Sequence, residues 1–282
     1  MKTIRLLYPD FVSGGLEIYY FGANLLQHLL PENPDQPVVR VDIAAPDGKE
    51  ESVTDGIYGR EEVSHGIKSA YEKIEEEKPD KIITIGGNCL VSFAPFDYLH
   101  GRYENTGILW IDAHPDVSTK ENGYPCAHAM VAGSLLGGGD SVMTDQRKNP
   151  PFAAEDLLYV GLQDIFDYQK AYLDKTGVHY QIQTKEFVPE SEIVSFVKAH
   201  DHLLVHFDID ALDEQFFHST YYANPEAEGD GAGGGRMRID DVGKVLYLAE
   251  KYSDVVGLTI AEYLPFDEYR LHQMLSGLNI FH

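Results

Sequence analysis

Two aspartates and one histidine alternate within a short segment of the chain. Asp112, His114 and Asp116 stand two residues apart in the stretch WIDAHPD, residues 110–116. If the backbone is extended there, alternate side chains project from the same face. Two carboxylates and an imidazole that are crowded together repel and lose hydration unless a cation lies between them. The triplet therefore predicts a metal site.

A second acidic motif repeats this spacing. Asp208 and Asp210 lie in the stretch HFDID, residues 206–210. The two motifs together supply four carboxylates and one imidazole, a set that suits two divalent cations sharing a bridging carboxylate. A calcium-binding helix–loop–helix is a poor match, because the glycine that its loop requires is missing after Asp208.

The motifs follow apolar, β-rich runs that alternate with helical patterns. The predicted strands cover residues 4–8, 38–44, 81–86, 107–112, 157–162, 179–183, 203–208 and 255–262. The predicted helices cover residues 18–30, 61–77, 91–98, 128–136, 165–176, 191–198 and 239–251. This alternation is typical of a parallel sheet covered on both faces. We therefore expect an α/β fold, a three-layer αβα sandwich on an eight-stranded, mostly parallel sheet, as one domain over residues 1–282.

Four of the predicted strands end in unusual chemistry. They run into Gly86-Gly87-Asn88-Cys89, into the two acidic motifs and into Glu262. In open α/β sheets, ligands bind outside the carboxyl ends of the strands. These four ends are the predicted functional site.

Charge and composition limit the partners. The 282 residues carry 46 Asp and Glu against 22 Lys and Arg, for a formal net charge of −24. Nucleic acid and anionic membranes would be repelled, whereas a cationic ligand would be attracted. Two cysteines cannot build a disulfide framework, and no apolar run has signal-peptide or membrane-span length, so we expect a cytoplasmic protein.

The order of GGNC, DAHPD, FDID and Glu262 resembles the arginase/agmatinase (ureohydrolase) family, from residue 81 through Glu262. The resemblance implies an arginase-like αβα fold with two manganese ions at the strand ends. One ion would be bound by Asp112, Asp116 and Asp208, and the other by Asp112, His114, Asp208 and Asp210, with Asp112 and Asp208 bridging. A metal-bound hydroxide would then attack a guanidinium carbon, which releases urea and an amine.

The resemblance also implies three candidate catalytic residues. His128 matches the family histidine that shuttles a proton to the leaving amine, a task that suits an imidazole with a near-neutral pKa. Glu262 matches the glutamate that binds the guanidinium group through a planar charge pair. Asp116 is the third candidate, beside its expected role as a metal ligand.

The first metal of the family takes one more ligand, the histidine of a GGDHS motif, and here Cys89 stands at that position. We expect Cys89 to be a ligand. Because a thiolate is soft, Co²⁺, Fe²⁺ or Zn²⁺ are then alternatives to Mn²⁺. The other interpretation is a small buried apolar side chain beside a single metal. A cysteine here also resembles a branch of the family that acts on Nω-hydroxy-L-arginine.

The sequence thus predicts a metal-dependent amidinohydrolase acting on a small cationic guanidine, either Nω-hydroxy-L-arginine or an arginine-like compound. The products would be urea or hydroxyurea plus an amine, and the resemblance implies a homo-oligomer. Alternatives are an agmatinase or a formimidoylglutamase, a hydrolase of another amide-like bond, and a metal-poor, non-catalytic binding protein. The substrate loops depart from arginases at Phe166 and Gln169, where acids are usual, and Lys120 is the candidate to meet a substrate carboxylate.

Overall fold

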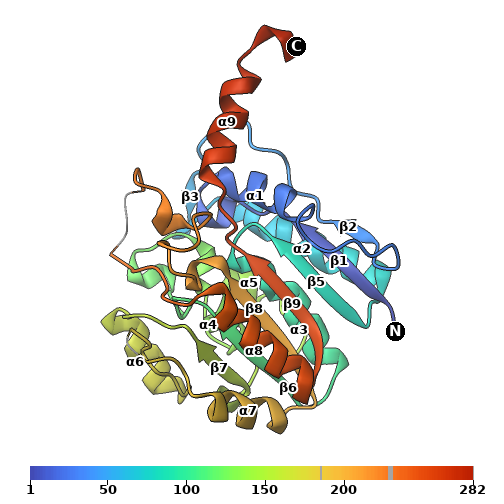
Figure 1. The fold of residues 1–282 in the computed structure, drawn as a ribbon, viewed down its shortest axis with the longest axis vertical. Coiled ribbons are helices and arrows are strands. Elements are labelled where there is room, and N and C mark those ends of the chain that lie inside the picture. The colour runs from blue at the N-terminus through green and yellow to red at the C-terminus, as the bar shows by residue number, and fades with distance from the viewer. Residues whose placement is uncertain (185, 228–230, 282) are drawn as a thin grey trace.

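The computed structural model describes residues 1–184, 186–227 and 231–281, and within them a central sheet lies between two layers of helices (Figure 1). The sheet has seven strands in the order β2-β1-β5-β9-β8-β6-β7, and every neighbouring pair in it is parallel. The strands are β1 (Thr3–Tyr8), β2 (Val38–Arg40), β5 (Lys81–Gly86), β6 (Thr106–Ile111), β7 (Leu157–Val160), β8 (His202–Asp208) and β9 (Asp254–Ala261). The arrangement confirms the predicted αβα sandwich.

Helices cover both faces of the sheet. The α-helices are α1 (Ile18–Leu26), α2 (Arg60–Glu77), α3 (Phe93–Arg102), α4 (Val131–Leu135), α5 (Ser141–Thr144), α6 (Asp167–Thr176), α7 (Glu190–Ala199), α8 (Ile239–Tyr252) and α9 (Phe266–Ser276). Apolar residues of α2, α3 and α4 pack on one face, and those of α7 and α8 pack on the other. Helix α1 shares this second side, where it packs on β1 and β5.

The central strands have no solvent-facing side. All six residues of β6 are buried, as is expected for a parallel strand with helices on both faces. Alternate side chains separate into two cores, so that Trp110 faces α3 while Leu109 faces α7 and α8. This alternation also fixes the side of the sheet on which residues beyond the strand end emerge.

The prediction of an eighth strand at residues 179–183 is wrong. Strand β7 ends at Val160, and Gly161 turns the chain away with a φ of 101°. One backbone bond joins Gln183 to the Leu162 carbonyl (2.7 Å), while the Gln183 side chain accepts from the Gly161 and Val188 amides (3.0 and 3.1 Å). The Gln183 side chain thus accepts from backbone amides that would bond to backbone carbonyls if residues 179–183 formed a further strand.

Other elements differ from expectation at their ends. The strand predicted at residues 38–44 stops at Arg40, since the Asp42 amide turns to the Ser69 hydroxyl (3.0 Å). A small antiparallel hairpin of β3 (Val53–Thr54) and β4 (Ile57–Tyr58) was not expected, nor was α9. Helix α9 has no buried residue and projects from the body at the C-terminal end of the chain (Figure 1). A helix that buries no residue needs no apolar stripe, which is the pattern by which helices are predicted.

Among the helices of the described residues, none is both long and apolar enough to cross a membrane.

Glycine at position 22 allows α1 to approach the chain that follows β9. A Cβ atom there would lie 1.9 Å from the Tyr263 carbonyl oxygen. We therefore expect Gly22→Ala to lower the free energy of unfolding by about 1–3 kcal/mol, because the backbone must move apart. Urea unfolding followed by circular dichroism measures it.

The matched control is Gly243→Ala on the exposed face of α8, where a Cβ meets nothing within 4 Å. This change should raise the free energy of unfolding by about 0.5–1 kcal/mol through helix propensity. Equal effects of the two substitutions would contradict the close approach at Gly22.

Candidate functional site

The four predicted strand ends lie side by side. Strands β5, β9, β8 and β6 are consecutive in the sheet, and being parallel they end at one edge. The predicted site residues Cys89, Asp112, His114, Asp116, His128, Asp208, Asp210 and Glu262 all meet there, and all but His114 and His128 are buried. The structure therefore brings these eight candidate catalytic and metal-binding residues together in one cluster.

Asp112, His114 and Asp210 form the outer part of this cluster. The His114 Nδ1 atom lies 3.0 Å from an Asp210 carboxylate oxygen and 3.6 Å from Asp112 Oδ1. The Trp110 indole N–H donates to Asp112 Oδ2 (2.9 Å), and Tyr222 and His114 Nε2 share a hydrogen bond (3.1 Å). These contacts fix the orientation of the carboxylate and of the imidazole.

Cys89 and Asp208 form the inner part. The Cys89 thiol donates to Asp208 Oδ2 (2.8 Å) and lies 3.6 Å from Glu262 Oε1. The other Asp208 oxygen accepts from the Asp210 amide (2.6 Å). Cys89 is thus in contact with two carboxylates in the site, which is a different environment from that of an ordinary core cysteine.

Asn88 anchors the loop that carries Cys89. Its side-chain amide donates to the Asp10 carbonyl (3.0 Å) and carboxylate (3.2 Å), and its oxygen accepts from Ser13 (2.8 Å) and the Leu90 amide (3.2 Å). Three of these four hydrogen bonds join the loop after β5 to the chain that follows β1, and the fourth is local to the loop. Asn88 therefore positions Cys89 rather than facing a ligand.

Glu262 and His128 form a pair at the wall of the cavity. His128 Nδ1 lies 3.0 Å from Glu262 Oε1, and the Tyr19 hydroxyl donates to the other oxygen (3.2 Å). Tyr124 forms a hydrogen bond with His128 Nε2 (3.1 Å). Glu262 thus has one oxygen toward an imidazole and the other toward a phenol.

Two acidic residues of the site have strained backbones. Asp116 and Glu262 have φ values of 49° and 61°, in the left-handed region that L-residues rarely occupy. Such conformations cost about 1–3 kcal/mol and are retained where the surroundings impose them, frequently at functional sites. Both side chains line the cavity as a result.

Burial and like charge dominate the electrostatics of the carboxyls. Burial, together with neighbouring carboxylates, raises the pKa of Asp112 and of Asp208 well above the usual range, and raises the pKa of Asp116 to about 7. Burial also acts on Asp210, but the adjoining His114 outweighs it and lowers the pKa of Asp210.

The histidines respond in opposite ways. Although burial disfavours a charged imidazole, contacts with carboxylates outweigh it and raise the pKa of His114 and of His128. Burial lowers the pKa of a third histidine, His206, to about 3. His206 is therefore neutral at physiological pH. His114 and His128, in contrast, favour the protonated form when no cation is bound.

The donor set fits divalent metal ions. In four overlapping groups, three or four side chains each offer a ligand atom within 4.8 Å of the others. The Asp116 Oδ2 atom is buried and has no hydrogen-bond partner. Buried carboxylate oxygens of this kind are costly without a cation, and the mixture of oxygen, nitrogen and sulfur donors can hold one.

Sequence reasoning gave no role to His206, which lies in β8 two residues before Asp208. Its imidazole is fully buried, stacks on Trp110 and belongs to a group with Cys89, Asp112 and Asp116. A signal was present, because the period of two that aligns Asp208 with Asp210 also puts His206 on the face of Asp208. Because His206 lies inside the strand and before the acidic motif, the motif alone does not mark it as a site residue.

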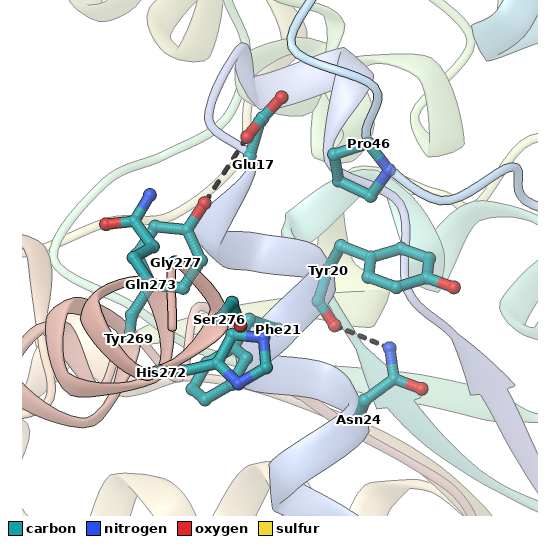
Figure 2. Close-up of a pocket in the computed structure, with 10 residues that line it drawn as sticks. All are labelled: Glu17, Tyr20, Phe21, Asn24, Pro46, Tyr269, His272, Gln273, Ser276 and Gly277. Carbon is teal, nitrogen blue, oxygen red and sulfur yellow. Dashed lines mark hydrogen bonds between the residues drawn. The ribbon is translucent and has the colours of Figure 1, made fainter. Parts of the chain in front are cut away.

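The cluster opens into a cavity of about 470 Å³. Its wall includes five acids, Asp116, Asp164, Asp208, Asp210 and Glu262, together with the tyrosines Tyr19, Tyr124, Tyr168, Tyr221 and Tyr222. Among the described residues that line it there is no lysine or arginine. A second cavity, of about 560 Å³, lies between α1 and α9, where Tyr269 donates to Glu17 (Figure 2). It includes none of the predicted site residues.

Of the predicted substrate-loop residues, two line the cavity and one does not. Lys120 forms ion pairs with Asp55 (2.9 Å) and Asp140 (3.4 Å) and does not line the cavity. Phe166 and Gln169 do line it, but the Gln169 side chain accepts from the Phe166 amide (2.9 Å) at the start of α6. Lys120 is therefore held by Asp55 and Asp140 outside the lining of the cavity, and Gln169 is held by its own helix.

Comparison with known proteins identifies the class. The model of the Arginase family matches residues 32–272, so the chain belongs to that family, whose members are hydrolases of C–N bonds in linear amidines. The arginase of Entamoeba histolytica is 26% identical over 187 residues, which cover 62% of this chain and 56% of the relative. The chain spans about half the length of the curated relatives that it matches.

Solved structures share the fold. The Entamoeba histolytica arginase in complex with L-ornithine has a TM-score of 0.76 at 20% identity, over 93% of this chain and 91% of that one. Formimidoylglutamase from Bacillus subtilis has a TM-score of 0.65 at 15% identity, over 93% and 78% of the two chains. A putative agmatinase from Clostridium difficile has a TM-score of 0.60 at 14% identity, over 97% and 91%.

The site makes the stability of the metal-free protein depend on pH. Carboxylate contacts raise the pKa of His114 and of His128 above 6.5, so above about pH 7 these imidazoles retain protons that the histidines of the unfolded chain have lost. Stability therefore falls as pH rises above about 7, by about 1.4 kcal/mol per pH unit for each retained proton. The lowered pKa values of Asp210 and His206 act below this range. Urea unfolding in the presence of a chelator measures the slope.

The variant His114→Asn should have a shallower slope, since it removes an imidazole whose pKa is raised well above 6.5. The control Asp80→Asn should keep the wild-type slope, because hydrogen bonds from Lys2 and Arg102 lower the pKa of Asp80 and it does not titrate in this range. Wild-type stability that is constant or rises from pH 7 to 8.5 would contradict the electrostatic description of the site.

Proposed function

We propose that this chain is a metal-dependent amidinohydrolase that hydrolyses a guanidino or N-hydroxyguanidino compound to urea or hydroxyurea plus an amine. The supporting observation is the convergence of buried carboxylates and imidazoles from four adjacent strand ends on one acidic cavity. The proposal treats residues 1–282 as one catalytic domain of a cytoplasmic homo-oligomer, with no nucleic-acid or membrane partner.

Two divalent ions fit the proposed ligand set. Mn²⁺ is the first choice, with Co²⁺, Fe²⁺ or Zn²⁺ as alternatives because of Cys89. The proposed ligands of the first ion are Cys89, Asp112, Asp116 and Asp208, and those of the second are Asp112, His114, Asp208 and Asp210. Bound ions supply Lewis acidity to the reaction.

Glu262 is proposed to bind the substrate guanidinium. Its carboxylate lines the cavity and can accept two N–H bonds from a planar cation, which orients the central carbon. Tyr19 donates to one oxygen and so limits rotation of the carboxylate. The charge of Glu262 also favours the protonated guanidine in this site.

Proton transfers are assigned to Asp116 and His128. Water adds to the guanidinium carbon, and the carboxylate of Asp116, whose buried Oδ2 atom has no hydrogen-bond partner, accepts its proton. When the bond from carbon to the leaving nitrogen breaks, His128 gives a proton to that nitrogen. The contact between His128 Nδ1 and Glu262 Oε1 (3.0 Å) raises the pKa of His128 and so favours the protonated form that this step requires.

The wall of the cavity favours a substrate with a cationic or neutral far end. Asp164 and the tyrosines can accept or donate hydrogen bonds to such a group, and the described lining offers no lysine or arginine to a carboxylate. A substrate with two carboxylates, such as formimidoylglutamate, fits this wall poorly. The same acids suit agmatine, which makes an agmatinase the second candidate.

The direct test is a guanidine panel with metal-reconstituted protein. It contains L-arginine, Nω-hydroxy-L-arginine, agmatine and formimidoylglutamate, with release of urea, hydroxyurea or formamide as the readout. We expect turnover of one of the cationic guanidines and none of formimidoylglutamate. Release of hydroxyurea from Nω-hydroxy-L-arginine without release of urea from arginine would support the branch of the family that acts on Nω-hydroxy-L-arginine. Absence of all products from metal-loaded protein would overturn the proposed function.

Glu262 and His128 should affect different kinetic constants. Replacing Glu262 by Gln removes the charge that pairs with the guanidinium. The lost transition-state stabilisation of about 2 kcal/mol or more should lower kcat/KM by roughly 30-fold or more. Replacing His128 by Asn should lower kcat by about 10²- to 10⁴-fold with a smaller change in KM. Steady-state kinetics on the best substrate of the panel measure both.

Glu17→Gln, in the second cavity, is the matched control and should leave both constants unchanged. Wild-type kcat/KM in Glu262→Gln would exclude the proposed guanidinium contact.

A further inference from the structure

His206 is a buried histidine that the proposed reaction leaves without a role. Its exposed fraction is 0%, and it stacks on Trp110 with ring centroids 3.7 Å apart. Its Nδ1 atom forms a hydrogen bond with the Ser92 hydroxyl (2.8 Å). Its Nε2 atom has no hydrogen-bond partner.

The Nε2 atom faces the inner part of the site. Ligand atoms of Cys89, Asp112, Asp116 and His206 all lie within 4.8 Å of one another. The Asp116 Oδ2 atom of this group is also buried and without a partner. Two buried polar atoms that lack partners therefore belong to the same small group of four side chains.

Asp112 does not satisfy the imidazole. The distance from His206 Nε2 to Asp112 Oδ2 is 3.7 Å, which is beyond hydrogen-bond range, and that oxygen already accepts from Trp110 (2.9 Å). A buried nitrogen without a partner is destabilising. The tautomer of the ring decides whether Ser92 or Nδ1 donates. In the tautomer that donates Nδ1–H to Ser92, Nε2 carries a lone pair directed at the group, as in a metal ligand whose other nitrogen is fixed by a hydrogen bond.

We propose that His206 Nε2 is a further ligand of the first metal ion, beside the ligands Cys89, Asp112, Asp116 and Asp208 proposed above. This proposal rests on the metal site of the proposed function and deepens it. The strand β8 would then supply the imidazole that the loop after β5 lacks, since Cys89 stands where the family has histidine.

The ligand set also determines metal preference. A set that adds one thiolate and one imidazole to carboxylates is softer and more nitrogen-rich than carboxylates alone. Such a set favours Co²⁺, Fe²⁺ or Zn²⁺ over Mn²⁺. We therefore expect the first site to bind Co²⁺ more tightly than Mn²⁺.

The test uses the protein loaded with Co²⁺. Trp110 is the single tryptophan of the chain, so quenching of its fluorescence reports binding beside His206. Coordination itself is read by proton NMR, in which the N–H of an imidazole bound to Co²⁺ is strongly shifted. Wild-type protein should show one such signal from His114 and one from His206, together with a sulfur-to-cobalt absorption band.

Two variants separate the ligands. In His206→Asn the amide can take the place of Nδ1 beside Ser92, while the Nε2 position is lost. One shifted N–H signal should disappear, and Co²⁺ affinity at the quenched site should fall by about 10-fold or more. In Cys89→Ser the absorption band should disappear while both imidazole signals remain.

The matched control is His100→Asn. His100 also stacks on an aromatic ring, that of Phe152, and its Nδ1 atom is buried without a partner, but it does not belong to the metal-ligand groups. This variant should keep both signals and the wild-type affinity. Circular dichroism confirms the fold of each variant.

Retention of both shifted signals in His206→Asn would overturn the proposal, even if affinity decreased, because that result assigns His206 a positioning role. Equal affinity for Co²⁺ in wild type and His206→Asn would also overturn it. The proposed function fails separately: if wild type shows the His206 signal but hydrolyses no guanidine, the site stands and the activity does not.

Discussion

The structure depends on how five carboxylates are accommodated at one edge of a sheet. Asp112, Asp116, Asp208, Asp210 and Glu262 are each at most 4% exposed, and they come from three adjacent strand ends. Their mutual repulsion is opposed by imidazoles and by a few donors. Since the usual cost of burying such charges is several kcal/mol for each ion, the fold holds these side chains in an arrangement that only cations can fully stabilise.

The surrounding residues keep that arrangement in place. Trp110 orients Asp112, and Asn88 joins the loop of Cys89 to Asp10, so that Asp112 and Cys89 are both held by buried contacts. The positive φ angles of Asp116 and Glu262 store strain at the same edge. A pre-organised site of this kind loses little entropy when a ligand binds, which supports a catalytic function over a passive one.

Much of this could be predicted from the sequence. Period-two spacing identified Asp112, His114 and Asp116, and the alternation of strands and helices predicted the sandwich. Residues 179–183 were misassigned because Gln183 uses its side chain where a strand would use its backbone, which no periodicity reveals. Helix α9 escaped prediction because it buries no residue.

His206 shows the limit more sharply. Its relation to Cys89 and Asp116 depends on the neighbouring positions of β8 and β6 in the sheet, where His206 and Trp110 are paired. Strand order is a property of the whole fold, so local spacing cannot provide it. The same holds for Lys120, whose partners Asp55 and Asp140 are distant in the chain.

The central claim is that the acidic edge is a metal site, and metal content after reconstitution tests it most directly. The purified protein would be stripped with a chelator, dialysed against Mn²⁺, Co²⁺ or Zn²⁺, freed of excess metal and measured by elemental analysis. The account predicts about two divalent ions per chain for at least one of these metals, as the four carboxylates of the two motifs require. A protein that retains no metal under all three conditions would contradict it.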